Sequence, residues 1–580
     1  MIRTFLFSFL LINLVAFGQS PSFDDVHVPK YESFNPIFSM QTGSGIKTPP
    51  PFQGIRTSAE WEEIEYLTVT WTSFTSILRE IVRHAGNETK VLIICSDSNT
   101  VKNYLIAGNV PIVNVKYLVA PYNSIWIRDY GQNTVYSDHV NNRFLVDWHY
   151  NRPSRPKDDT VPSRISKSLN VPLYETTLAP YDLISTGGNF MSDGMGTAFS
   201  SQLIDQENPS LTASQIDTIA KKFMGIDRYI RFPVLPYDGI HHIDMHMKLL
   251  DEQTLLVGQY PAGVSDGPQI EANLQYILSN FNSSFGTPYK VIRIPMPPDK
   301  FGLYPSANGS YTTYTNAVFV NKTIILPTYY QQYDTTALRI WKESMPGYNV
   351  IGIDCDNTSA NIIAQSGAIH CITHSIGSSD PLLIVHQPLE NNCDSINSFL
   401  ISASIEHSSG ISSAKVYWTN DTSQGFINSL PMTNASGNTW NTNLPPQSFG
   451  NSVYYYIEAV SNSGKVMHRP IVAPNGFWKF TVNCITTGIN AITDKIEFKP
   501  IYPNPANSIT CIPVSSDSEQ KIKITLNNLY GQIVKNIFDG KITKGEKNFF
   551  IMATEFPPGT YYIQISSSVG VSTQKLIIID

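Results

Sequence analysis

A cysteine that lies among polar residues is the first candidate for chemistry in this sequence. Cys371 occurs in GAIHCITHS, between a histidine and a threonine and just after small residues. Exported chains usually lock their cysteines in disulfides, whereas a free thiolate beside a base is a nucleophile. The surroundings of Cys371 predict a nucleophile, provided that the rest of the chain supplies a base and a substrate pocket.

Three further polar clusters precede Cys371 in the chain, and each contains residue types that bind or transfer protons. The candidates are Trp126, Arg128 and Asp129 in SIWIRDYGQ, then His241, His242, Asp244 and His246 in HHIDMH, and Asn316 in YTTYTNAVF.

HHIDMH allows more than one interpretation. On a strand, His242, Asp244 and His246 would share one face and could bind a metal ion. The spacing differs from that of the common zinc hydrolase motifs, so we favour no metal. A histidine acid or base beside a carboxylate needs only His242 and Asp244. The remaining interpretation is that these histidines have no catalytic role and are ordinary core or surface side chains with their hydrogen bonds satisfied.

The combination of these clusters suggests a substrate. His242 could act as the base for Cys371. Two buried carboxylates, Asp129 and Asp244, are costly unless a cation satisfies them. Guanidinium is a planar cation that binds carboxylates through two N–H groups at once. A thiol, an imidazole and two carboxylates in one pocket therefore indicate attack on a guanidinium carbon, whereas a papain-like protease has no use for the paired carboxylates.

The bulk composition limits the class of protein. A chain of 580 residues is too long for one core and predicts several domains. The net charge of -7 and the isoelectric point near 6.0 give no basic surface, which argues against a nucleic-acid partner. The 30 Tyr and 28 Phe, beside many Ser, Thr and Asn, are typical of β-rich extracellular domains.

The N-terminus predicts export. Residues 1–19 have a charged start, an apolar centre and small residues before the expected cleavage point, as in a secretory signal peptide. Residues 20–55 are rich in Pro, Ser and Gly and predict a leader or loosely ordered arm. No other stretch approaches the roughly 20 apolar residues that span a bilayer, so we expect no transmembrane segment.

The remaining chain divides by pattern. Residues 56–380 alternate strand-like and helix-like segments, and hairpins such as KLLDEQTLLVG and AVFVNKTIILP recur, which suggests a pseudo-symmetric α/β array. Residues 381–485 carry short strands between Ser, Asn and Gly turns, as in an immunoglobulin-type β-sandwich. Residues 486–580 comprise a linker and a small all-β domain.

The motifs WIRDYG, TGGNFMSDG, GIHHIDMH, YTNAVFVN and GAIHCITH, in this order, closely resemble the agmatine deiminase and bacterial peptidylarginine deiminase family. The opening SAEWEEIEYLTVTW is also similar to the start of that family. The resemblance covers roughly residues 56–380. It implies the pentein fold, a five-fold pseudo-symmetric α/β propeller, which would explain the repeated hairpins.

The resemblance also implies roles for single residues. Cys371 would be the nucleophile, His242 the general acid and base, and Asp129 and Asp244 the residues that hold the guanidinium. Asn316 matches a pocket position that is also Asn in the bacterial peptidylarginine deiminases. The implied reaction passes through a covalent thiouronium on the cysteine, releases ammonia, and ends in a ureido product such as citrulline. It uses no metal or organic cofactor.

Substrate binding is expected to involve three more residues. By the same resemblance, Trp126 would pack against the aliphatic stem of the substrate. HYNRPSRPKDD is similar to a run in the bacterial peptidylarginine deiminase whose arginines clamp the carboxylate of a C-terminal arginine; Arg152 matches the first, and Arg155 the second after an insertion at Ser154. Two arginines would repel an arginine substrate unless they met an anion. We therefore favour peptidyl or free arginine over agmatine, whose product would be N-carbamoylputrescine in putrescine biosynthesis.

The tail, with YPNPANS, NLYGQIV and PPGTYYIQI, resembles a type IX secretion sorting domain. The order of leader, catalytic, immunoglobulin-like and sorting domains is also that of the bacterial peptidylarginine deiminase. We expect passage through the periplasm and the type IX secretion machinery to the medium or the cell surface.

Two hypotheses from other classes compete with this one. The chain could be a catalytically silent surface-binding protein that acts through its β-sandwich. It could also be an extracellular metallohydrolase that uses HHIDMH, in which case a chelator would abolish its activity.

Thiol labelling of the mature protein tests the assignment of the cysteines. We expect Cys371 to react as a free thiol, because a nucleophile must stay reduced. Cys393 and Cys484 flank the segment expected to form a β-sandwich and are the expected disulfide partners, measured as one linked peptide after proteolysis. A disulfide that contains Cys371 would contradict the nucleophile assignment.

Overall fold

The computed structural model describes residues 45–392, 394–483, 496–529, 531–567 and 570–579. The predicted signal peptide and most of the predicted leader lie outside these residues, as do Cys393 and Cys484. The described chain forms two compact units. The larger consists of residues up to Leu389, Ser398–Leu444 and Val453–Lys479, and the smaller of Glu390–Asn397, Pro445–Ser452 and Phe480 onward.

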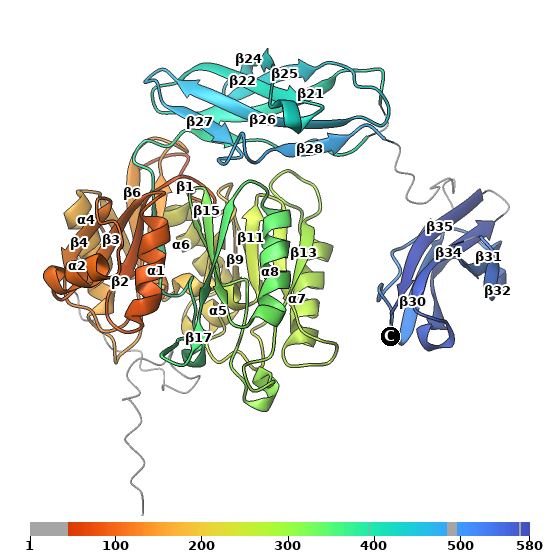
Figure 1. Ribbon diagram of the computed structural model, residues 1–580, viewed down its shortest axis with the longest axis horizontal. Coiled ribbons are helices and arrows are strands. Elements are labelled where there is room, and N and C mark those ends of the chain that lie inside the picture. Colours follow the sequence, from red (N-terminus) through yellow and green to blue (C-terminus); the bar gives the residue numbers. More distant parts are fainter. Residues whose placement is uncertain (1–44, 393, 484–495, 530, 568–569, 580) are drawn as a thin grey trace, which may run out of the picture. The chain divides into compact units, whose positions relative to one another are not determined.

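Five small sheets repeat one strand order through the α/β segment (Figure 1). Each contains an antiparallel strand pair, and the second strand of that pair lies parallel to a third strand. Four pairs are hairpins: β5 (Asn133–Tyr136) with β6 (Arg143–Trp148), β8 (Met191–Ser192) with β9 (Thr197–Ser201), β11 (Met247–Asp251) with β12 (Thr254–Gln259), and β14 (Val318–Val320) with β15 (Thr323–Thr328). In the fifth, β19 (His374–Gly377) pairs with β2 (Ile64–Thr70), which comes much earlier in the chain.

A helix joins the second and third strand of every repeat, as a right-handed parallel crossover requires. The helices are α1 (Thr75–Ala85), α4 (Val161–Leu169), α6 (Ala213–Met224) after the short α5 (Leu203–Glu207), α7 (Gly267–Asn280) and α8 (Gln331–Ser344). The third strands are β3 (Lys90–Cys95), β7 (Leu173–Thr176), β10 (Arg228–Phe232), β13 (Lys290–Pro295) and β16 (Asn349–Asp354).

Additional elements extend two of the sheets. The sheet of β19, β2 and β3 gains β4 (Val115–Val119), which follows α2 (Ser98–Ala107). The sheet of β5, β6 and β7 gains β1 (Arg56–Thr57) at its edge. A short hairpin of β17 (Asp356–Asn357) and β18 (Ala360–Asn361) follows β16.

Neighbouring repeats pack against each other through their helices. Helix α6 contacts β7 of the preceding repeat, α7 contacts β10, α8 contacts β13, and α1 contacts β15 and β16. Apolar spacing explains this packing: α1, for example, buries Ile77, Leu78, Ile81 and Val82 on one face. Each of these four helices thus packs against a strand of the repeat that precedes its own.

The last strand of the α/β segment, β19, forms an edge of the sheet that contains β2, β3 and β4. Strand β19 pairs antiparallel with β2, with His374 opposite Thr68. The Thr68 hydroxyl also donates to the carbonyl of His374 at 2.8 Å. Segments about 300 residues apart are thus held side by side, which fixes the loop just before β19, where Cys371 lies.

The β-sandwich segment contains two antiparallel sheets. Residues on β21 alternate between buried and exposed, as expected for a strand with one face in a core. One sheet is formed by β20 (Leu383–Val385), β21 (Phe399–Glu406), β25 (Thr439–Leu444) and β24 (Thr433–Ser436); the other by β23 (Asn428–Pro431), β22 (Ile411–Thr419), β26 (Ser452–Ser461) and β27 (Val466–Arg469), with β28 (Trp478–Thr481) beside β26.

The C-terminal region is also all-β and has its own apolar core, to which Ile512, Ile524, Ile563 and Leu576 belong. Its two sheets are β29 (Ile496–Phe498), β30 (Ile509–Ser516) and β33 (Gly545–Met552), and then β32 (Ile533–Ile542), β31 (Gln520–Asn527), β34 (Gly559–Ser567) and β35 (Gly570–Ile578).

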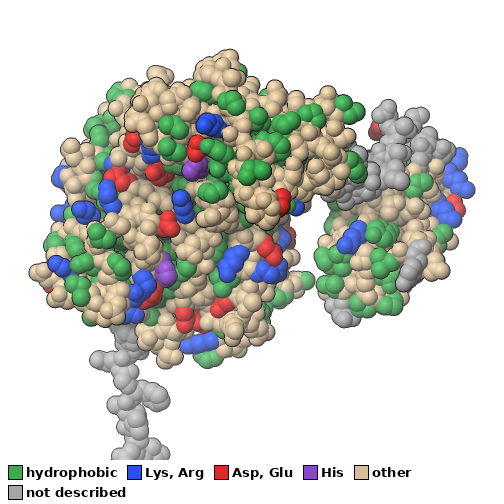
Figure 2. Space-filling model, turned by 45° about the horizontal axis from the view of Figure 1, so that its top comes forward, with side chains coloured by type: hydrophobic (Ala, Val, Ile, Leu, Met, Phe, Trp, Pro, Cys, Tyr) green, Lys and Arg blue, Asp and Glu red, His purple; other side chains and the backbone are tan. Residues whose placement is uncertain are grey.

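The surface offers no broad field of one charge on the side that Figure 2 displays. Acidic and basic side chains are intermixed over the larger unit in that view. Among the helices of the described residues, none combines the length and the apolar character that crossing a membrane requires.

Candidate active site

The five repeats place a polar residue at the same point, two to four positions before the first strand of the antiparallel pair. These residues are Asp129 before β5, Asn189 before β8, Asp244 before β11, Asn316 before β14 and Cys371 before β19. Short helical turns carry three of them: α3 (Ile127–Tyr130), η3 (Gly187–Asn189) and η4 (Ile243–Met245), and η3 contacts both others. The Asn189 amide is bonded to the backbone of Ser201, whereas the equivalent loops of the other repeats supply the site described below.

Cys371 is fully buried and its thiol lies next to an amide and a carboxylate. Asn316 Nδ2 donates to Cys371 Sγ at 3.3 Å, and Asp244 Oδ2 lies 4.0 Å from the same sulfur. The Asn316 side-chain oxygen accepts the backbone N–H of His370 at 2.9 Å, which fixes the orientation of the amide. The structure thus brings Cys371, Asn316 and Asp244 into one site.

His242 and Asp129 form the other side of the site. His242 Nδ1 lies 3.8 Å from Asp129 Oδ1, and both side chains are almost completely buried. Burial lowers the pKa of His242 to about 4, against the opposing effect of Asp244, so the imidazole is neutral at physiological pH. Burial, followed by the repulsion of Asp244, raises the pKa of Asp129 to about 8.

The surroundings of the Cys371 thiol favour its protonated form over the thiolate. Burial first, and then the charges of Asp244 and Asp129, raise the pKa of Cys371 well above its ordinary value. The hydrogen bonds from the Ala368 backbone and Asn316 act in the other direction. A cation that enters beside the carboxylates would cancel their effect and favour the thiolate.

Two functional candidates escaped the sequence analysis. His370 Nδ1 lies 2.6 Å from Asp244 Oδ2, and His370 Nε2 lies 2.6 Å from Glu60 Oε1. Glu60 Oε2 in turn accepts from Lys248 Nζ at 2.6 Å, and Arg128 Nη1 lies 3.4 Å from Oε1. Burial would raise the pKa of Glu60, but His370, Lys248 and Arg128 hold it well below its ordinary range.

This network gives Asp244 a partner within the protein. The Asp244 carboxylate does not depend on a substrate for a hydrogen-bond partner, because His370 Nδ1 lies 2.6 Å from its Oδ2. The signal was present in the sequence, since His370 directly precedes Cys371 and Glu60 stands in SAEWEE, but no local pattern links two residues 310 positions apart.

HHIDMH does not form a strand. Ile243–Met245 form a 3₁₀ turn, and strand β11 begins only at Met247. The expectation that His242, Asp244 and His246 share one face of a strand is therefore wrong. The ring of His246 instead packs edge-on against Phe232, with centroids 6.3 Å apart. Within the part of the chain that the structure describes, no three His, Cys, Asp or Glu side chains are grouped as metal ligands.

The charges of the two arginines expected to bind a carboxylate, Arg152 and Arg155, act to lower the pKa of Asp129. Arg152 Nη1 donates to Glu207 Oε1 at 2.8 Å, and its guanidinium lies over the Tyr150 ring. Arg155 is buried and its Nη1 lies 3.5 Å from the Tyr150 hydroxyl. A substrate is therefore not the only source of an anion for Arg152, because Glu207 already supplies one.

Trp126 is fully buried at the start of α3, within the main apolar core of the α/β segment. Of the other cysteines, Cys95, Cys355 and Cys511 are buried free thiols. Burial first, and then the charge of Asp97, raises the pKa of Cys95 to about 11, which agrees with an inert core role.

Comparison with known proteins accounts for this geometry. The profile of the Porphyromonas-type peptidyl-arginine deiminase family matches residues 56–376, more than half of the chain.

The chain belongs to this deiminase family.

Curated relatives support the assignment. A provisionally named agmatine deiminase of Vibrio parahaemolyticus is 22% identical over 371 residues, which cover 57% of this chain and 99% of the relative. Another from Marinomonas is 25% identical over 378 residues, with 57% and 97% covered. The solved agmatine deiminase of Enterococcus faecalis has a TM-score of 0.50 at 18% identity and covers 58% of this chain and 100% of its own, which shows a shared fold.

Members of the deiminase family are hydrolases that act on guanidino C–N bonds, and this chain is an enzyme of that class. Residues 500–579 match the profile of a secretion system C-terminal sorting domain. The protein is therefore secreted or held at the cell surface.

The TGGN segment of the deiminase domain needs glycine for close packing. A Cβ on Gly188 would overlap the ring of His242, and one on Gly187 would overlap the carbonyl of Arg128. The segment can therefore carry η3 close to α3 and η4 only without side chains at these positions.

We expect Gly188→Ala to lower kcat/KM on a guanidine substrate by about 100-fold, because the added methyl group displaces the His242 ring. Thermal unfolding should change little, since a side-chain ring moves more easily than backbone. Gly239→Ala is the matched control, because a Cβ there meets nothing within 4 Å. Equal kinetics of both variants would show that the position of His242 does not depend on Gly188.

Proposed function

We propose that the protein is a secreted deiminase that hydrolyses the guanidinium of arginine, above all C-terminal peptidyl-arginine, to citrulline and ammonia. The observation that carries this proposal is the convergence of the Cys371 thiol, the Asn316 amide, the His242 imidazole and the carboxylates of Asp129 and Asp244 from separate loops. This set provides a nucleophile, a proton carrier and acceptors for a planar cation.

The fold that we propose is the five-fold pseudo-symmetric pentein propeller. Five sheets of equal strand order, linked in sequence by their helices and closed by the pairing of β19 with β2, support it. We assign residues 56–380 to this catalytic domain, 381–485 to an immunoglobulin-like sandwich and 486–580 to the linker and sorting domain.

Substrate binding would activate the nucleophile. In our proposal the guanidinium donates to Asp129 and Asp244, and its charge offsets the two carboxylates that hold the Cys371 thiol protonated. Trp126 would line the path of the aliphatic stem. The proton that leaves Sγ is carried to His242, whose neutral imidazole can accept it.

In the first half-reaction the thiolate attacks the guanidinium carbon and a C–S bond forms. The protonated His242 gives its proton to one nitrogen, the C–N bond breaks, and ammonia leaves a thiouronium cation on Cys371. Asn316, which donates to the sulfur, would hold it on the line of attack.

In the second half-reaction water attacks the thiouronium carbon and displaces the Cys371 sulfur. Neutral His242 takes a proton from the attacking water, a C–O bond forms, and the C–S bond breaks. Sγ recovers the proton, and the ureido product loses its extra proton to solvent, where ammonia takes one up. Side chains and water complete this cycle without a cofactor.

Arg152 and Arg155 support the choice of a substrate with a carboxylate. The charges of both act on Asp129, and in our proposal they face the C-terminal carboxylate of an arginine whose guanidinium reaches Asp129 and Asp244. The substrate would exchange with Glu207 for the guanidinium of Arg152.

The Arg152–Glu207 ion pair also favours a second candidate, agmatine. This substrate has no carboxylate, and its binding would leave the 2.8 Å contact between Arg152 and Glu207 unchanged. The product would then be N-carbamoylputrescine.

A panel of substrates distinguishes these functions. We expect the enzyme to prefer an N-acetylated peptide that ends in arginine over its C-terminal amide by about 100-fold, because the amide cannot pair with an arginine. Cys371→Ala should abolish turnover, a loss of at least about 10⁴-fold. Ureido-product formation is the measurement, and free arginine and agmatine complete the panel.

Arg152→Gln should remove the preference for the free C-terminus, whereas Lys157→Gln, which removes an exposed charge from the same loop, should not. Turnover of agmatine alone would support the second candidate. A folded protein that turns over none of the substrates would support the silent surface-binding hypothesis.

The acidity of the site predicts an alkaline rise in kcat/KM. Because the pKa of Asp129 is raised to about 8, this carboxyl is protonated below that pH in the free enzyme and binds a cation poorly. We expect kcat/KM to rise about tenfold per pH unit below roughly pH 8 and then to level off, while kcat changes less, since bound guanidinium keeps Asp129 ionised. An N-acetylated substrate is suitable, because its guanidinium does not titrate in this range. A flat kcat/KM between pH 6 and 9 would contradict the role of Asp129.

A further inference from the structure

The imidazole of His370 is held between two carboxylates, those of Asp244 and Glu60, and takes no part in the proposed catalytic steps. Its Nδ1 lies 2.6 Å from Asp244 and its Nε2 lies 2.6 Å from Glu60. A neutral imidazole has only one N–H, so it can donate in both directions only as the imidazolium cation. His370 is fully buried, which leaves these two carboxylates as the partners of both nitrogens.

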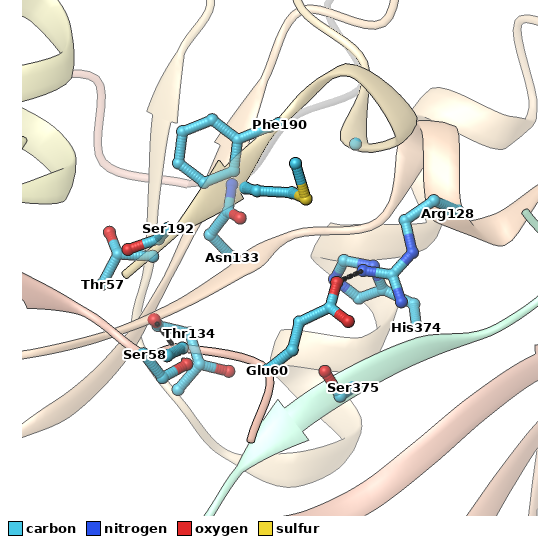
Figure 3. A pocket seen from close by; sticks show the side chains of 13 residues that line it. Thr57, Ser58, Glu60, Arg128, Asn133, Thr134, Phe190, Ser192, His374 and Ser375 are labelled. Carbon is cyan, nitrogen blue, oxygen red and sulfur yellow. Dashed lines mark hydrogen bonds and ion pairs between the residues drawn. The ribbon is translucent and has the colours of Figure 1, made fainter. Parts of the chain in front are cut away.

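Glu60 is anchored independently of His370. Lys248, which is itself buried, donates to Glu60 Oε2, and Arg128 approaches Oε1 from the other side. Figure 3 shows the Glu60 carboxylate and the Arg128 guanidinium turned toward each other, with His374 beside them. Both residues line a polar pocket of about 40 Å³. Glu60 therefore offers His370 a fixed acceptor.

The backbone around His370 belongs to the same assembly. Its N–H donates to Asn316 and its carbonyl accepts from Arg128 Nε at 3.3 Å. The next residue along the chain is Cys371. His370 therefore contributes both the anchored peptide next to Cys371 and the ring that contacts Asp244.

We propose that His370 is a positioning residue that, held by Glu60, orients Asp244 so that its second oxygen faces the guanidinium. The proposal rests on the proposed function, because it gives Asp244 a guanidinium ligand. The distances leave Asp244 Oδ2 occupied by His370, 4.0 Å from the sulfur, and Oδ1 is the atom left to bind substrate. Loss of the imidazole would free the carboxylate to rotate, and a shift of about 1 Å is sufficient to cost about 100-fold in rate.

Two amide substitutions separate positioning from packing. The side-chain nitrogen of asparagine can take the place of imidazole Nδ1, and that of glutamine the place of Nε2. His370→Asn keeps a donor to Asp244 and loses the contact to Glu60, whereas His370→Gln does the reverse. We expect His370→Gln to lose about 100-fold in kcat/KM, chiefly through a higher KM, and His370→Asn to lose less than about tenfold.

A second pair of variants tests the anchor. Glu60→Ala removes the acceptor of His370, and Glu62→Ala is the matched control, because Glu62 belongs to the same segment and pairs with the buried Arg56 at 2.5 Å. Both should lower the unfolding temperature, but only Glu60→Ala should raise KM by about tenfold or more.

The outcomes are decisive in each direction. Equal losses in His370→Asn and His370→Gln, or equal kinetics of Glu60→Ala and Glu62→Ala, would overturn the positioning role, since packing alone would explain them. Binding of an arginine peptide to the Cys371→Ala background, measured by calorimetry, distinguishes this failure from that of the proposed function. Binding without wild-type turnover refutes the function alone, and the His370 comparison is then made on Kd. Absence of both refutes both.

Discussion

The central constraint on this molecule is the burial of carboxylates beside a thiol. Charged groups removed from water are destabilising unless cations and hydrogen bonds compensate them. Asp244 is compensated inside the protein, through the 2.6 Å contact with His370 that continues to Glu60, Lys248 and Arg128. Asp129 is compensated less fully, and burial raises its pKa to about 8. The two carboxylates are thus unlike, one permanently paired and one able to take up a proton.

This difference would give the site a simple form of substrate control. Without a ligand, burial and the carboxylates raise the pKa of the Cys371 thiol and keep it unreactive. A cation with the size and planarity of guanidinium reverses the effect of the carboxylates, so the reactive thiolate would form only when the substrate is in place. For an enzyme outside the cell, an unreactive resting thiol also limits oxidation.

The repeated architecture is what makes such a concentration of charge possible. Each repeat has an antiparallel strand pair, a crossover helix and a parallel strand, and in four of the five the loop before the pair carries a polar residue of the site. The surrounding sheets and helices bury a large apolar core that includes Leu67, Leu255, Ile324 and Trp341. Strands that are 300 residues apart, such as β2 and β19, complete the assembly.

The sequence by itself determined the local elements and the family, and it named the candidate residues of the site. Hairpins such as β11–β12 and β14–β15 and helices α1 and α7 follow from short-range patterns, because the alternation of apolar residues reports which side chains face a core. The five ordered motifs were sufficient for the family, since each keeps its reactive residue in a recognisable local context. Only the tertiary structure decided how charges are paired. The contact of His370 with Glu60 joins residues 310 positions apart, and that of Arg152 with Glu207 joins residues 55 positions apart. HHIDMH forms a turn, although its alternating pattern was also compatible with a strand. The physical reason is that the energy of a buried ion pair depends on distance and dielectric environment in the folded chain, and neither is encoded in the spacing of nearby residues.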